Sequence, residues 1–142
     1  MIEARGITFG YRAGRPVLSD WNASIGRGEI VAIIGPSGSG KSTLLYLLGT
    51  LVRPWSGSLR VDDVNVAALG DRGRSDLRAS KVGFVFQDAL LDTRRSIIDN
   101  VVEGAVYRGA DRRSASQRAR QLLEQLGVDV EATRRATDLS GG

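Results

Sequence analysis

The first residues of the chain are patterned as antiparallel β-structure. Residues 2–9 and 17–25 are rich in β-forming residues or alternate apolar with polar ones, and a turn-prone stretch containing glycine and proline separates them. Two shorter segments, 58–61 and 64–66, flank the acidic pair Asp62-Asp63. These patterns predict short strands that are joined by turns and pair with one another.

Two other apolar segments lack a polar face. Residues 29–34 and 81–87 are short runs rich in Ile, Val and Phe, as expected of strands that are buried on both sides in a parallel sheet. A glycine-rich turn follows the first of them, and 41–49 is a helix-compatible segment of leucines with Gly49 near its end. We therefore expect an α/β protein.

The rest of the chain is patterned for helices. Residues 67–80 are polar and are expected to be helical toward their end. Apolar residues recur at helical spacing over 97–106, and a further helix fits 114–126 with Gly127 as its C-cap. The apolar face predicted for that last helix consists of Ala115, Ala119, Leu122, Leu123 and Leu126. The pattern thus predicts a β-rich core over about 1–87 and a helical part over about 88–142.

Composition excludes several kinds of chemistry. The 142 residues are about one domain in length and include neither cysteine nor histidine. Disulfides, thiolate metal sites, a cysteine nucleophile and a Ser-His-Asp triad are therefore excluded within this stretch. Its chemistry must use carboxylates, Lys, Arg, hydroxyls and backbone amides.

Charge and hydropathy do not indicate a nucleic-acid or membrane-spanning protein. The formal net charge is +4, and arginines are scattered among acids. We interpret their one mild cluster as a solvated helix face. It contains Arg108, Arg112, Arg113, Arg118 and Arg120. The longest apolar run, 30–34, is far too short to span a bilayer, and no signal segment follows Met1, so we expect a cytoplasmic chain that binds no nucleic acid.

One stretch matches the phosphate-binding loop pattern G-x-x-x-x-G-K-[ST] at every position: Gly35-Pro36-Ser37-Gly38-Ser39-Gly40-Lys41-Ser42. A triphosphate needs converging N–H donors, and glycines let the amides of a tight loop point inward together. The following helix N-terminus favours an anion. Lys41 can reach the β- and γ-phosphates, and Ser42 can offer its hydroxyl to Mg²⁺. The loop alone leaves transport or motor ATPases, GTPases and nucleotide kinases open.

Further motifs narrow this choice. Tyr11 lies upstream of the loop, Trp55-Ser56-Gly57 precedes a short strand, residues 82–87 read Val-Gly-Phe-Val-Phe-Gln, and the chain ends in Leu139-Ser140-Gly141-Gly142. In this order the motifs resemble the ATP-binding domain of ABC transporters over essentially the whole chain, with the lipoprotein-releasing and macrolide-exporter group as the most similar. The resemblance implies a P-loop NTPase fold of the ABC ATPase type. It would have an antiparallel β subdomain, a partial parallel core sheet and a helical subdomain, with the C-terminal part of the domain absent.

The resemblance also implies the cofactors ATP and Mg²⁺ and a role for each motif residue. Lys41 and Gln87 would be catalytic, and Ser42 and Gln87 would hold Mg²⁺. Tyr11, with Val17, would pack on the adenine ring. The full nucleotide-binding set would be Tyr11, Val17, Gly35, Pro36, Ser37, Gly38, Ser39, Gly40, Lys41, Ser42 and Thr43. The signature residues Ser140, Gly141 and Gly142 would grip the γ-phosphate bound to the opposite subunit.

The partners implied by the resemblance are a transmembrane permease and a second ATP-binding subunit. The permease would contact the loop that follows Gln87, over 88–96, and would hold the chain at the inner face of the cell membrane. Within that loop, Asp92-Thr93-Arg94-Arg95 replaces the Leu-Pro-Thr type of run that is common in the exporter group. The second subunit would pair head to tail, so that each site takes its loop from one copy and its signature from the other.

A P-loop ATPase also needs an acid that holds Mg²⁺. In the family this acid, the catalytic glutamate and the switch histidine follow the signature motif, so we expect an N-terminal portion that does not hydrolyse ATP alone. Two alternatives stay open: a soluble ABC protein without a transport role, and a P-loop kinase of small molecules in which Asp62 or Asp63 is the magnesium ligand. In the ABC interpretation these two acids form a turn between short antiparallel strands.

Overall fold

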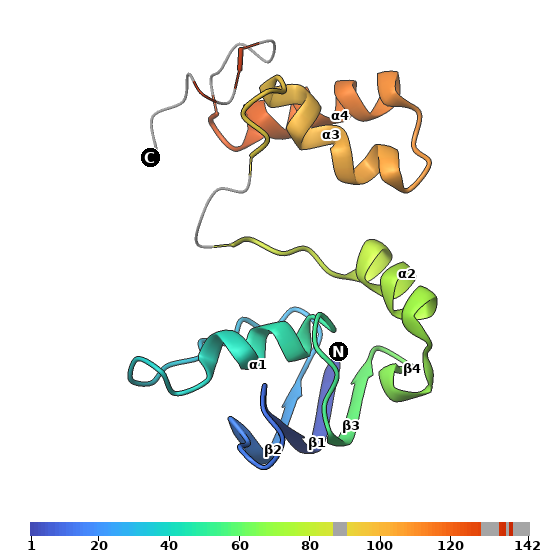
Figure 1. The fold of residues 1–142 in the computed structure, drawn as a ribbon. Coiled ribbons are helices and arrows are strands. Elements are labelled where there is room, and N and C mark those ends of the chain that lie inside the picture. Colours follow the sequence, from blue (N-terminus) through green and yellow to red (C-terminus); the bar gives the residue numbers. More distant parts are fainter. Residues whose placement is uncertain (87–90, 129–133, 136, 138–142) are drawn as a thin grey trace. The chain divides into compact units, whose positions relative to one another are not determined.

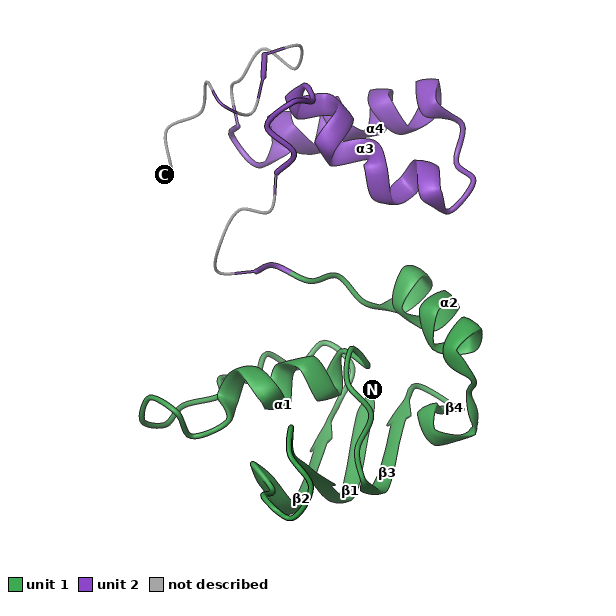
Figure 2. Ribbon diagram, viewed as in Figure 1, with its two compact units in different colours: residues 1–84 green, residues 85–142 purple. Residues whose placement is uncertain are grey.

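The computed structural model describes residues 1–86, 91–128, 134, 135 and 137 (Figure 1). The chain divides into two compact units, Met1–Phe84 and Val85–Gly142 (Figure 2). Unit 1 contains a small sheet with helices beside it, and unit 2 contains a pair of helices. The boundary expected between 87 and 88 falls outside the described residues.

The sheet of unit 1 has four strands in the order β2-β1-β3-β4, all paired antiparallel (Figure 1). The strands are β1 (Ile2–Phe9), β2 (Leu18–Ile25), β3 (Ser56–Val61) and β4 (Val64–Asn65). Ala4 in the central strand pairs with Ala23 on one side and with Leu59 on the other. The predicted pair of N-terminal strands and the later hairpin are both confirmed.

Helix α1 (Lys41–Leu48) supplies the other half of the core. Leu44, Leu47 and Leu48 of this helix are buried in one cluster with residues of β1 and β3. The strand residues in that cluster are Ala4, Ile7, Phe9, Leu59 and Val61. The strands and the helix each contribute one apolar face to this core. Apolar residues lie on one face of a strand when they recur at every second position, and on one face of a helix when they recur every three or four positions.

The two segments expected as buried parallel strands are not strands. Residues 29–34 and 82–86 have no strand assignment, and Ile30 and Val85 are both 99% exposed. A strand exists only where a neighbour accepts and donates its backbone hydrogen bonds, and within the described residues the sheet contains β1 to β4 alone. Apolar composition therefore predicts a buried strand only where flanking strands exist. The expected partial parallel sheet is absent from the described residues.

The hairpin between β3 and β4 turns at Asp62 and Asp63, as the ABC interpretation predicted. Asp62 adopts a left-handed backbone conformation with φ 50°. Its carboxylate lies 3.0 Å from the amino group of Met1, 3.5 Å from Arg27 and 3.6 Å from Lys81. The hydrogen bond and charge of the Met1 amino group, followed by the charges of Arg27 and Lys81, hold the pKa of Asp62 below its usual value. This acid therefore ties the hairpin to three cations.

The remaining elements are helical. A single-turn helix η1 (Val66–Ala68) and helix α2 (Asp71–Lys81) complete unit 1, which confirms the helix expected late in 67–80. The helices in the described part of unit 2 are α3 (Ile97–Tyr107) and α4 (Arg112–Gln125), as predicted. The core between these two helices contains Ile98, Val102 and Val106 of α3 and Ala115, Ala119 and Leu123 of α4.

Two of the residues predicted on the apolar face of α4 lie outside this core. Leu122 and Leu126 are exposed, whereas Ala119 is buried and Ala115 and Leu123 pack beside it. In the described part of the chain the main neighbour of α4 is α3, and a single helix neighbour covers one narrow row of positions spaced four apart. The prediction of the helix was right, and the width of its buried face was overestimated.

Three of the helices end in the same hydrogen-bonded motif. In each, the N–H of a left-handed residue donates to the carbonyl three positions back, and the next N–H donates to the carbonyl five positions back, as in a Schellman motif. The left-handed residue is Gly127 (φ 69°) after α4, Gly109 (φ 86°) after α3 and Thr50 (φ 61°) after α1. The predicted capping by Gly127 is confirmed, and Thr50 occupies a position that favours glycine.

Candidate nucleotide-binding site

The glycine-rich loop joins the mostly exposed segment before it to the first turn of α1. Gly38 and Gly40 have φ values of 77° and 88°, which side chains other than glycine adopt at a cost. A Cβ at Gly40 would lie 2.9 Å from Cγ1 of Val17, whereas a Cβ at Gly38 would meet nothing within 4 Å. Gly40 is therefore favoured both by its backbone conformation and by the close approach of Val17.

Lys41 is folded back over this loop. Its Nζ donates to the carbonyl oxygen of Gly35 at 2.9 Å and to that of Pro36 at 2.6 Å. The ammonium group thus lies at the start of α1, beside the loop that precedes it. Cation and amide donors come together here because the loop is tight, which the three glycines of the motif permit.

The N-terminus of α1 has no side-chain cap. Gly40 is its N-cap and offers no side-chain hydrogen bond, and the first turn has no acidic residue. The first N–H groups of a helix have no partner within the helix, and they carry partial positive charge. By contrast, Ser96 caps α3 and Asp111 caps α4 through their side chains. The start of α1 can therefore accept an oxyanion from outside the chain.

Tyr11 reaches the same place from beyond the end of β1. Its hydroxyl lies 3.3 Å from Oγ1 of Thr43, which is buried in α1. The residue is 63% exposed, and its ring packs edge-on against Phe9, with ring centroids 5.2 Å apart and planes at 81°. Phe9 in turn contacts Trp55 at a centroid distance of 6.3 Å. An exposed aromatic ring is therefore held beside the loop by a row of rings.

The structure brings the predicted nucleotide-binding residues together within unit 1. Tyr11 contacts Thr43, Val17 lies against Gly40, and Lys41 crosses back over residues 35 and 36. Ser42 is exposed in the first turn of α1, where a metal ion could reach its hydroxyl. The two residues far from the motif in sequence, 11 and 17, thus meet the helix that the motif starts.

Four other predicted residues cannot be placed. Gln87, Ser140, Gly141 and Gly142 lie outside the described residues. Sequence reasoning also missed one residue of the site, Phe9, which supports the ring of Tyr11. Phe9 is the last residue of β1 and Tyr11 follows two positions later, and this close spacing of two aromatic residues was a usable signal.

The described part of the chain has no cluster of metal ligands beside the loop. No group of three or more His, Cys, Asp or Glu residues that could hold a metal is found there. Asp62 is engaged by Met1, Arg27 and Lys81, and the carbonyl of Asp63 accepts from Arg60. This use of Asp62 as a structural ion-pair centre does not favour Asp62 as the magnesium ligand that the kinase alternative needs.

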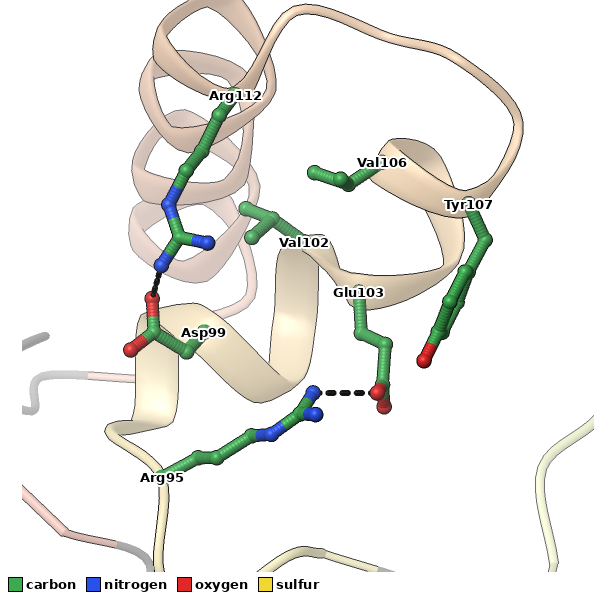
Figure 3. A pocket seen from close by; sticks show the side chains of 7 residues that line it. All are labelled: Arg95, Asp99, Val102, Glu103, Val106, Tyr107 and Arg112. Atoms are coloured by element: carbon green, nitrogen blue, oxygen red, sulfur yellow. Dashed lines mark hydrogen bonds and ion pairs between the residues drawn. The ribbon is translucent and has the colours of Figure 1, made fainter.

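Unit 2 contains a pocket of about 370 Å³ that is lined by α3, α4 and the segment before α3 (Figure 3). Val102 and Val106 supply its apolar surface. Two ion pairs line it: Arg95 with Glu103 and Arg112 with Asp99. The hydrogen bond and charge of Glu103 raise the pKa of Arg95 above its ordinary value. Residue 95 belongs to the loop that was expected to contact a membrane partner.

The model of the ABC transporter family matches residues 18–142. The chain belongs to the ABC transporter family. It is 40% identical over its whole length to the lipoprotein-releasing system ATP-binding protein LolD of Cereibacter sphaeroides, and 43% identical to the macrolide export ATP-binding/permease protein MacB 1/2 of Paracoccus denitrificans. The chain spans 65% of the first relative and 22% of the second.

Solved structures of ATP-binding cassettes have the same fold, which confirms the expected ABC ATPase type. The cassette MJ0796, solved as a dimer in a post-hydrolysis state bound to ADP and phosphate, matches with a TM-score of 0.87 and 33% identity, covering 99% of this chain and 64% of that one. The protein cbiO1 of Clostridium perfringens, part of the ABC transporter complex cbiONQ, matches with a TM-score of 0.82 and 29% identity, covering 98% of this chain and 55% of that one. Across the described residues no helix has the length and apolarity needed to cross a membrane.

Proposed function

We propose that this chain is the ATP-binding part of an ABC transporter subunit of the lipoprotein-releasing and macrolide-exporter type. The observation that carries the proposal is the uncapped start of α1, with Lys41 and the glycine loop beside it. Converging amides, a helix N-terminus and a lysine are the combination that binds a triphosphate. The names of the relatives at about 40% identity support the transporter group.

Each residue of the site has a part in this function. The amides of the loop bind phosphate oxygens, and Lys41 exchanges its two carbonyl partners for the β- and γ-phosphates. Tyr11 offers its exposed ring to adenine while its hydroxyl stays beside Thr43. Ser42, exposed in the first turn of α1, offers its hydroxyl to Mg²⁺. Gln87 completes the metal site, and residues 140–142 serve the site of a second subunit.

A fluorescent ATP analogue tests this assignment. We expect ATP to displace it from the chain, and Lys41→Ala to weaken ATP binding at least ~10-fold, because a charge-assisted contact to phosphate is lost. Lys81→Ala, which removes the other lysine of the chain and one contact of Asp62, is the matched control and should leave ATP affinity essentially unchanged. An equal loss of ATP affinity in both variants, or no displacement of the analogue by ATP, would contradict the proposal.

Hydrolysis requires more than this site. Among the residues that the structure describes, no acidic cluster could hold a metal, and Asp62 is already bound to three cations. We therefore expect the 142-residue chain to bind ATP without steady turnover. Multiple turnover by the purified chain, abolished by Lys41→Ala, would refute this expectation.

The membrane partner would bind unit 2. The pocket of Figure 3 combines apolar surface, two ion pairs and Tyr107, which suits a short amphipathic helix of a permease at the inner face of the membrane. Co-expression with a permease of the lipoprotein-releasing type tests this role. Arg95→Glu should abolish co-purification, and Arg113→Glu, an exposed charge reversal on α4 outside the pocket, should not. Loss of co-purification in both variants, or in neither, would argue against the pocket as the binding site of the permease.

A further inference from the structure

A second pocket, of about 160 Å³, lies in unit 1 and is lined by the segment after α1, by β3, by η1 and by α2. None of the residues assigned to the nucleotide lines it. Trp55, Leu59 and Val66 supply apolar surface, and Leu59 and Val66 are buried. Arg53 and Arg74 add two guanidinium groups to the same lining. The pocket therefore combines an apolar floor with cationic walls.

Arg74 is an unusually enclosed cation. Its side chain is only 15% exposed, and its terminal nitrogen pairs with Asp71, whose own side chain is 91% exposed. The Nε–H of Arg74 is buried and has no hydrogen-bond partner. A buried donor without an acceptor costs free energy, and so does a charge withdrawn from water and paired only at its outer end. An anion that contacts the exposed part of the guanidinium group from the pocket would compensate the charge.

Several arginines near this pocket act on one carboxylate, that of Asp71. Arg74, through its hydrogen bond and charge, and then Arg53 and Arg78 lower the pKa of Asp71. Arg53 donates to the carbonyl of Leu69 at 3.3 Å, and Arg78 donates to that of Thr50 at 2.9 Å. A neutral carbonyl does not compensate the charge of a guanidinium group, and in the described structure the ion pair of Arg74 with the exposed Asp71 leaves Arg53, the other cation of the pocket, with a carbonyl partner, so the site favours a further anion.

We propose that this pocket binds a small organic carboxylate. Its carboxylate group accepts hydrogen bonds from Arg74 and Arg53, and its short apolar body lies on Trp55, Leu59 and Val66. The volume corresponds to about five water molecules, which suits an acid of a few carbon atoms. The inference does not rest on the ATP site, because none of the residues assigned to the nucleotide lines this pocket, although Trp55 also contacts Phe9.

Isovalerate, a branched acid of this size, is the probe. The chain has two tryptophans, and one of them, Trp55, lines the pocket, so a ¹H–¹⁵N spectrum gives one indole signal at the site and one reference signal from Trp21. At constant ionic strength we expect a saturable shift of the Trp55 indole with a smaller effect on Trp21. Inorganic phosphate, which lacks an apolar body, should bind at least ~10-fold more weakly.

Two variants and one matched control decide the assignment. Arg74→Met and Arg53→Met should each weaken isovalerate binding at least ~10-fold, and Arg53, being exposed, can be changed without burying a new group. Arg72→Met makes the same charge change on an exposed position of α2 outside the pocket and should leave isovalerate affinity essentially unchanged. No saturation, equal loss in the control, or phosphate binding as tightly as isovalerate would overturn the proposal. ATP affinity should be unchanged throughout.

Discussion

Replacing Thr50 by glycine should stabilise unit 1. Thr50 is the left-handed residue that follows α1, and its side chain is almost completely buried. Its Oγ1 has no hydrogen-bond partner, while its N–H donates to the carbonyl of Leu47 at 2.9 Å and its own carbonyl accepts from Arg78 at 2.9 Å. These bonds hold the backbone in the left-handed conformation, which a β-branched residue tolerates poorly.

The opposing contributions can be weighed. A left-handed backbone costs a residue other than glycine about 1–2 kcal/mol. A buried hydroxyl without a partner costs roughly 1–3 kcal/mol. Against these gains, glycine loses more conformational entropy on folding, which costs about 0.5–1 kcal/mol. Removal of the two buried side-chain carbons, Cβ and Cγ2, costs about 1.6 kcal/mol. The gains exceed the losses, and we expect Thr50→Gly to raise the free energy of unfolding by about 1 kcal/mol.

Tryptophan fluorescence during thermal unfolding reports this change, because Trp21 and Trp55 both lie in unit 1. An increase of about 1 kcal/mol should raise the midpoint by about 4–8 °C in a unit of this size. Thr50→Ala is the control: it removes the hydroxyl and the methyl group but keeps a Cβ at positive φ, so its midpoint should also lie above that of the wild type. A lower midpoint for Thr50→Gly than for the wild type would refute this expectation, since packing of the two side-chain carbons would then outweigh strain and the unpaired hydroxyl.

Two further predictions concern the loop and the hairpin. Gly38→Ala and Gly40→Ala should each destabilise unit 1 by about 1–2 kcal/mol through backbone strain. Gly40→Ala should lose more stability than Gly38→Ala, because its Cβ meets Val17. In a double-mutant cycle measured by urea unfolding, Val17→Ala should recover this additional loss. Additive effects of Gly40→Ala and Val17→Ala would contradict this prediction. Asp62→Asn should reduce stability at neutral pH. The pKa of Asp62 is lower in the folded chain than its unfolded value of about 3.9. Its contribution to stability is therefore present above the unfolded pKa and is lost as pH falls through the folded pKa. The urea midpoints of the wild type and the variant should converge in acid.

The sequence predicted those features that are set by local pattern. Alternation in 2–9, helical spacing in 97–106 and Gly127 as a cap all depend on near neighbours along the chain, and the structure has the corresponding elements. The segment 29–34 is different, because its strand state depends on partners far away in sequence.

The candidate site shows the same division. The motif of residues 35–42 predicts a tight loop before a helix, since glycine and lysine at that spacing carry the geometry locally. The contact between Tyr11 and Thr43 joins residues 32 positions apart, and it depends on how β1 and α1 pack. Val17 against Gly40 is a contact of the same kind. Such contacts could be expected from the family resemblance but not from periodicity.

Mapping ATP onto the chain by amide chemical shifts is the most direct test of the nucleotide site. The chain of 15.2 kDa suits this measurement residue by residue. Titration with ATP in the presence of Mg²⁺ should produce saturable shifts that are largest for residues 35–43 and for Tyr11, and Lys41→Ala should suppress them. Saturable shifts centred on another surface, or shifts of the loop that survive Lys41→Ala unchanged, would contradict the assignment of the ATP site.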